Sequence, residues 1–77
     1  MDEKQIYAAI LKDLLQKTTL SYSEIATKSG YRERSIYNLK NGKHKPSLSG
    51  FCRILRVLGE DPVEVVSKII QEMEGKR

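Results

Sequence analysis

Cysteine occurs only once in this 77-residue chain, at Cys52, and proline only twice. A single cysteine excludes a disulfide within the chain, which fits a reducing compartment. No apolar run approaches the ~20 residues of a membrane span, and the start, MDEKQIYAAI, lacks a signal peptide's basic segment and long apolar stretch. With 39% hydrophobic residues and so few prolines, the chain is globular rather than disordered. We therefore expect one domain over residues 1–77 and a cytoplasmic location.

Acidic residues are scarce in one short stretch, residues 32–45. Against Glu33 alone it sets five bases: Arg32, Arg34, Lys40, Lys43 and Lys45. On either side of this stretch acids and bases balance, so the whole formal net charge of +4 falls within it. A solvated basic face is the simple explanation of such a run, and a binding surface for a polyanion is the alternative.

Strand alternation between hairpin turns is also missing, and the chain carries helix signals instead. Ser21 and Glu24 form a capping box, and Gly30 suits the left-handed conformation that closes a helix. Asp61 and Pro62 are good first residues for the last helix. These signals predict an all-α fold of five helices. The helices span about residues 2–17, 22–29, 33–41, 48–58 and 62–74.

Apolar residues recur at helical spacing in these segments, which predicts the side of each helix that faces the core. The expected core positions in the first four helices are Ile6, Ile10, Leu11, Leu14, Leu15, Ile25, Ala26, Ile36, Leu39, Leu48, Phe51, Ile54, Leu55 and Leu58. A core this small, without a disulfide or a metal, suggests that oligomerisation adds stability.

Two short helices joined at Gly30 and followed by the basic loop 43–46 are the elements of a helix-turn-helix over about residues 22–41. In that motif the second helix lies in the major groove of DNA, where all four base pairs can be distinguished. Ile36 and Leu39 hold this helix to the core. The residues that project from its opposite side are Glu33, Arg34, Tyr37 and Asn38.

Residues 20–66 read LSYSEIATKSGYRERSIYNLKNGKHKPSLSGFCRILRVLGEDPVEVV. This stretch resembles the Cro/C1-type helix-turn-helix family of phage and bacterial repressors, also called the Xre family. The matching positions are Ser21, Glu24, Ile25, Ala26, Gly30, Ser35, Ile36, Asn41, Gly42, Pro46, Ser47, Leu58, Gly59 and Pro62. The resemblance implies a compact five-helix, lambda-repressor-like domain that binds double-stranded operator DNA as a two-fold homodimer. It also implies a transcriptional regulator, in particular a repressor.

Carried over position by position, the resemblance assigns two sets of DNA contacts. Base edges or nearby phosphates are expected to be contacted by Arg32, Glu33, Arg34, Tyr37 and Asn38. Phosphates are expected to be contacted by Tyr22, Asn41, Lys43 and Lys45, and also by Lys40, which adds positive charge on the DNA side.

The chain departs from the family at two places. Lys40 stands where the family often has a glutamate, and Leu15 stands where that glutamate's arginine partner commonly lies. Losing both members of an ion pair can be nearly neutral, whereas losing one leaves an uncompensated charge. Arg32 replaces the usual small capping residue of the recognition helix, which weakens the helix start and suggests a use for its guanidinium.

The last helix carries more apolar residues than a small core can cover. They recur at three- and four-residue spacing as Val63, Val66, Ile70 and Met73, with Val65 and Ile69 beside them. We expect part of this helix to form a self-complementary dimer interface. The expected interface residues are Val66, Ile69, Ile70 and Met73.

Other functions find less support in the residues. His44 has no second ligand at a suitable spacing, so we expect neither a metal nor a cofactor. The sequence shows no nucleophile with an attendant base and no phosphate-cradling loop, which argues against an enzyme. RNA binding is also less supported, because the sequence lacks the exposed stacking aromatic residues with which proteins bind single strands. The main alternative is an antitoxin or a protein-interaction adaptor that uses the same fold.

Overall fold

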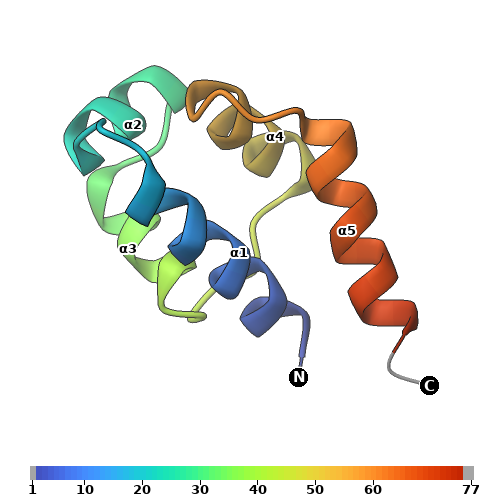
Figure 1. Ribbon diagram of the computed structural model, residues 1–77. Helices are drawn as coiled ribbons and strands as arrows, with labels where there is room; N and C mark the ends of the chain where they lie inside the picture. Colours follow the sequence, from blue (N-terminus) through green and yellow to red (C-terminus); the bar gives the residue numbers. More distant parts are fainter. Residues whose placement is uncertain (1, 76–77) are drawn as a thin grey trace.

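Helices pack around a shared set of buried side chains in the computed structural model, which describes residues 2–75 (Figure 1). Across that range the helices are α1 (Glu3–Lys17), α2 (Tyr22–Ser29), α3 (Glu33–Lys40), α4 (Leu48–Val57) and α5 (Pro62–Glu74), and no strand forms. The predicted all-α class and the five helices are confirmed. None of the helices in residues 2–75 has the length and apolar character to cross a membrane.

The capping residues explain where the helices begin and end. The Glu24 amide donates to Ser21 Oγ at 3.1 Å, and the Ser21 amide donates to Glu24 Oε1 at 3.0 Å, as predicted. The hydrogen bond from the Ser21 backbone, with that of its side chain, lowers the pKa of the Glu24 carboxyl. The stabilisation that the ionised Glu24 carboxylate gives to the cap is therefore fully present above the pKa that Glu24 has in the unfolded chain. It is lost as the pH falls through the lower pKa that Glu24 has in the folded protein. Gly30 ends α2 with φ at 80°, the predicted left-handed conformation.

The core takes buried apolar side chains from all five helices. Helix α1 contacts α3 and α5, α2 contacts α3 and α4, and α4 contacts α5. The buried residues that form this contiguous cluster are Ile6, Leu11, Ile25, Ala26, Ile36, Leu39, Phe51, Ile54, Leu55, Val65 and Ile69. Most predicted core positions are among them, and four others pack against the core while partly buried: Ile10, Leu14, Leu15 and Leu58.

The prediction that Leu48 faces the core is wrong, because its side chain is 58% exposed. The first turn of α4 packs instead through Gly50, which is buried against Tyr31. A helix turns about 100° per residue, so Leu48 and Gly50 point to nearly opposite sides. When Gly50 faces inward, Leu48 must therefore face outward.

Replacing Gly50 with alanine should destabilise the fold by about 1–3 kcal/mol, as overpacking does, although alanine is the better helix former. A Cβ atom at residue 50 would overlap the Tyr31 hydroxyl and lie 2.9 Å from Ser47 Oγ. Urea or thermal unfolding measures the change in stability. Tyr31→Phe removes the hydroxyl that the new Cβ atom would overlap. In a protein that carries Tyr31→Phe, Gly50→Ala should therefore cost less stability than it does in the wild type. A Gly50→Ala protein as stable as the wild type would contradict this close packing.

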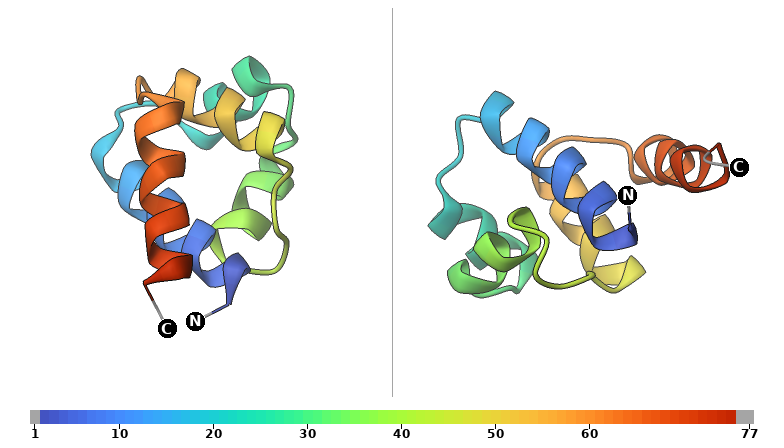
Figure 2. Two further views of the ribbon diagram at one scale, coloured as in Figure 1. Left: turned by 90° about the vertical axis from the view of Figure 1, so that its right-hand side faces the viewer. Right: turned by 90° about the horizontal axis from the view of Figure 1, so that it is seen from below.

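The two short helices α2 and α3 lie at one end of the molecule and α5 lies at the other (Figure 1). Figure 2 shows the same separation from below, with α1 and α4 between the two ends. A surface on α3 and a surface on α5 can therefore contact different partners without overlapping.

Candidate nucleic-acid interface

Helix α3 is held to the core along one side only. Ile36 and Leu39 are its buried residues. On the other side Glu33, Arg34 and Tyr37 are exposed and Asn38 is half-buried. The structure thus brings these four predicted base-contacting residues to one open face of α3, with Arg32 immediately before it.

The start of α3 is capped differently from the other helices. Arg32 is its N-cap residue, with extended backbone, and makes no side-chain capping hydrogen bond. Its side chain is exposed to solvent. Glu33 lies in the first turn, where a negative charge interacts favourably with the positive end of the helix. Arg32 therefore occupies the N-cap position without capping the helix, and its exposed side chain directly precedes α3.

Two tyrosines and one lysine form a cluster between α2 and α3. The ring centroids of Tyr22 and Tyr37 lie 4.5 Å apart, with the ring planes tilted by 52°. The Nζ atom of Lys40 lies 5.3 Å from the Tyr22 centroid and 5.1 Å from the Tyr37 centroid. Both distances fall within the ~6 Å typical of cation–π contacts. Lys40, at the predicted departure from the family, is thus placed against aromatic rings.

The loop after α3 keeps its basic residues close to the helix. The Lys43 amide donates to the Asn38 carbonyl at 3.0 Å, and the Gly42 amide donates to the Leu39 carbonyl at 3.2 Å. Gly42 has φ at 75°, a left-handed conformation that favours glycine. Asn41, Lys43 and Lys45 are all exposed. The predicted phosphate contacts of this loop therefore lie directly beyond the end of α3.

Lys45 has a partner within the protein. Its Nζ lies 3.4 Å from Glu3 Oε1, and both side chains are about half exposed. Such solvent-exposed pairs contribute little, about 0–1 kcal/mol, so a phosphate can compete with Glu3 for the ammonium. Lys45 is therefore only weakly held by Glu3 and stays available to an anion.

A hollow of about 270 Å³, lined by polar and apolar residues, lies beside α3. It lies between α3 and the loop that leads to Ser47, the N-cap residue of α4. Its lining residues are Tyr31, Ser35, Asn38, Leu39, His44, Lys45, Pro46 and Ser47.

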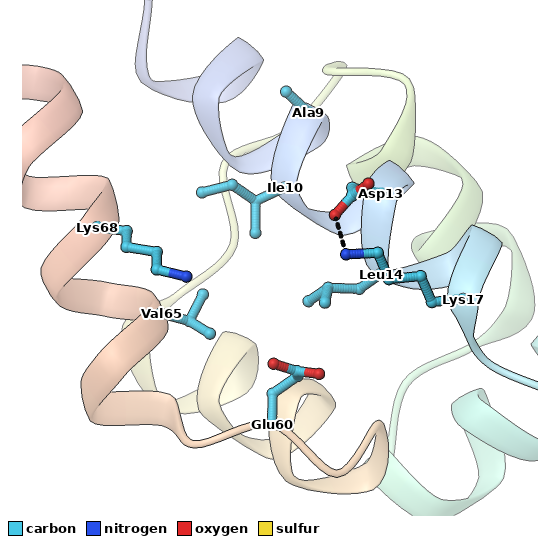
Figure 3. Close-up of a pocket in the computed structure, with 8 residues that line it drawn as sticks. All are labelled: Ala9, Ile10, Asp13, Leu14, Lys17, Glu60, Val65 and Lys68. Atoms are coloured by element: carbon cyan, nitrogen blue, oxygen red, sulfur yellow. Dashed lines mark ion pairs between the residues drawn. The ribbon is translucent and has the colours of Figure 1, made fainter.

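A second hollow, of about 300 Å³, lies between α1 and α5 (Figure 3). Ile10, Leu14 and Val65 give it an apolar lining, and its charged residues are two acids and two lysines: Asp13, Glu60, Lys17 and Lys68. Asp13 and Lys17 pair at 3.1 Å. Because its charges balance, this groove favours neither a polyanion nor a polycation, and it is separate from the basic surface around α3.

The apolar residues of α5 divide between the core and the surface. Val65 and Ile69 point inward, and Ile69 is only 1% exposed. The expectation that Ile69 lies in a dimer interface is corrected here, because its side chain is already buried within its own chain. Val66 and Met73 are half-buried, Ile70 is 47% exposed and Val63 is 74% exposed.

A comparison with protein families matches residues 11–65 to the family described as Helix-turn-helix, of the Cro/C1 type. The matched residues run from the middle of α1 into the first turn of α5 and contain α2, α3 and α4 completely. Searches of curated proteins and of solved structures find no match. The family match covers more than half of the chain and agrees with the two short helices, the glycine turn and the exposed face of α3. The chain therefore belongs to the Cro/C1-type helix-turn-helix family, the Xre family, of DNA-binding transcription regulators.

Proposed function

We propose that the protein is a sequence-specific repressor that binds an inverted repeat in double-stranded DNA as a homodimer. The open face of α3, with Arg34, Tyr37 and Asn38 on it and the excess positive charge around it, is the observation that carries this proposal. The function is binding without catalysis, cofactor or metal. We place the protein in the cytoplasm, as a single domain over residues 1–77.

The residues on and around α3 divide by chemistry into base readers and phosphate contacts. A guanidinium pairs best with the two acceptors of guanine, a carboxylate accepts from cytosine, and an amide pairs with adenine. Arg34, Glu33 and Asn38 supply these groups from one helix face. The loop lysines and Arg32 suit phosphates, because an exposed cation binds any sequence equally well. Specificity would therefore come from α3 and most of the salt dependence from its surroundings.

A homodimer is supported by the exposed apolar residues of α5. Val63, Val66 and Ile70 lie on one side of this helix, away from the buried positions, and leave apolar area in contact with water. A second copy of the same surface would cover it, as two-fold symmetry requires. Because α5 lies at the end opposite α3, pairing through α5 leaves both copies of α3 available for DNA (Figure 1).

Repression requires only that the protein occupy DNA that transcription must use. A basic α3 surface and a dimer surface on α5 are sufficient for that task. We infer repression for this reason.

Selection of bound duplexes from random DNA at physiological salt tests the proposed function. We expect an enriched inverted repeat whose half-sites lie about one helical turn, roughly 34 Å, apart. Nuclease protection of the DNA upstream of the protein's own gene would then locate the natural operator. Failure to enrich any sequence, with binding that depends on salt alone, would argue against a sequence-specific repressor.

Binding should depend strongly on salt. Four basic residues per subunit lie near α3: Arg32, Lys40, Lys43 and Lys45. If a dimer neutralises roughly six phosphates, the slope of log affinity against log salt concentration should be about −5. Titrations at several salt concentrations measure this slope, and an affinity indifferent to salt would contradict the phosphate contacts.

A matched pair of variants isolates the contribution of one lysine. Lys43→Ala should weaken binding to all sequences alike and make the slope less negative by about 1 for each phosphate that is no longer neutralised. Lys68→Ala removes the same charge from α5, at the opposite end of the molecule, and should change the slope much less. Equal effects of the two variants would mean that only the net charge matters.

A further inference from the structure

We propose that Tyr22 and Tyr37 together form a contact surface for a pyrimidine 5-methyl group in the major groove, and that Lys40 positions their rings. This inference rests on the proposed DNA-binding function and deepens it. It adds a residue of α2 to the base-reading surface, which otherwise consists of α3 and the residue before it.

The geometry makes the two tyrosines one surface. Their ring centroids are 4.5 Å apart, so the side chains are in direct contact. Tyr37 is 44% exposed on the open face of α3, whereas Tyr22 is half-buried and packs against the core. Tyr22 therefore supports Tyr37 from the α2 side, and the exposed parts of the two rings continue the face that carries Arg34 and Asn38.

The chemistry of the rings favours an apolar feature of the DNA. In the major groove thymine presents one apolar group, its 5-methyl, and 5-methylcytosine presents the same group. Burying one methyl group against an apolar surface strengthens binding about fourfold. Each ring already packs against the other, so a whole base cannot stack between them unless they separate. A methyl group can instead contact the exposed parts of both rings without such a change.

Lys40 links the two rings. Its ammonium lies 5.3 Å from one centroid and 5.1 Å from the other, so it interacts with both rings at once. Lys40 follows Tyr37 by three residues, which places the two side chains next to each other on α3. We therefore assign Lys40 as a positioning residue that restricts the rings, in addition to its charge near the phosphates.

Single-base substitutions in the selected operator test the proposal. Each thymine is replaced in turn by uracil, which removes only the methyl group. The wild type should show one thymine in each half-site at which uracil weakens binding about fourfold. Tyr37→Ala and Tyr22→Ala should bind the thymine and uracil operators equally, whereas Tyr37→Phe should keep the preference because the hydroxyl is not required.

Two further arms separate the sources of the methyl group and the role of Lys40. Operators with cytosine and with 5-methylcytosine at the same position are also compared. Of thymine and 5-methylcytosine, the base that gives the tighter-binding operator is the natural source of the methyl group. Lys40→Met keeps an unbranched apolar side chain, as long as the lysine without its ammonium group, and removes the charge. It should lower the ratio of thymine to uracil affinity, a ratio that removing a phosphate interaction alone would leave unchanged.

Each outcome decides the proposal. Wild-type protein that binds its operator specifically but is insensitive to uracil at every thymine would overturn it. A preference that persists unchanged in both folded alanine variants would also overturn it and leave the rings as a structural support between α2 and α3. Absence of any specific operator is a different result, because it rejects the proposed function itself. Thermal unfolding of each variant confirms that the compared proteins are folded.

Discussion

A glutamate in place of Ile70 should convert the proposed dimer to a monomer at tens of micromolar. Ile70 is 47% exposed, on the side of α5 that it shares with Val63 and Val66, so a charge there would face the same charge on the second copy. Two linked half-site contacts gain on the order of 100-fold or more over one. Operator affinity should therefore fall by about that factor. Sedimentation measures the first effect and DNA titration the second.

A matched control lies one residue away on the same helix. Gln71 is also exposed, and Gln71→Glu adds the same charge to a different side of α5. It should leave both the dimer and the operator affinity nearly unchanged. Because residue 70 is not in the core, both variants should keep the helical content of the wild type. A wild type that sediments as a monomer, or an Ile70→Glu protein that remains dimeric, would remove α5 from the interface.

The ends of the helices could be predicted from the sequence because caps act over a few residues. The capping box of Ser21 and Glu24, the glycine at residue 30 and the Asp61–Pro62 start all involve neighbours in the chain. Each signal is complete within one turn, and packing elsewhere does not change it. The open face of α3 was predictable for a related reason, since Ile36 and Leu39 fix its orientation through helical periodicity alone.

What could not be predicted depends on how helices meet. Leu48 lies on the apolar stripe of α4 and Ile69 on that of α5. Each stripe is wider than the surface that neighbouring helices cover, so the packing of those helices decides which of its residues are buried. Gly50 against Tyr31 buries one edge of α4 and exposes Leu48. The core takes Ile69 from α5 and leaves Ile70 in water. In the sequence, the apolar residues that become buried and those that stay exposed follow the same helical spacing.

In the candidate nucleic-acid interface, too, some contacts follow from neighbours in the chain and others from the way the helices pack. Tyr37 and Lys40 are three residues apart on one helix, so their proximity could be predicted from spacing. Their contact with Tyr22 depends on the angle between α2 and α3, and the pairing of Lys45 with Glu3 joins residues 42 positions apart. Such contacts carry no local signal in a single sequence. They nevertheless decide which lysines are already engaged before DNA binds.

Arg34 should carry the largest share of base discrimination. It lies in the first turn of α3, the part of a recognition helix that usually approaches base edges, and its side chain is exposed. A guanidinium can donate two hydrogen bonds to guanine, and each good pairing of this kind is worth about 1–3 kcal/mol of discrimination. From the chemistry of Arg34 and Glu33 we therefore expect a half-site with a G·C pair near the start of α3.

Replacing Arg34 with alanine should therefore cost about 1–3 kcal/mol on the operator and much less on random DNA. Arg34→Lys is the informative control, because lysine keeps the charge but cannot make the same planar pair of hydrogen bonds. Lysine should restore the affinity for random DNA without restoring most of the discrimination. Titrations of operator and random duplexes at one salt concentration measure both quantities. If the alanine variant loses affinity for the two duplexes equally, and lysine restores both, Arg34 contacts phosphate and the base-specific contacts lie elsewhere on α3.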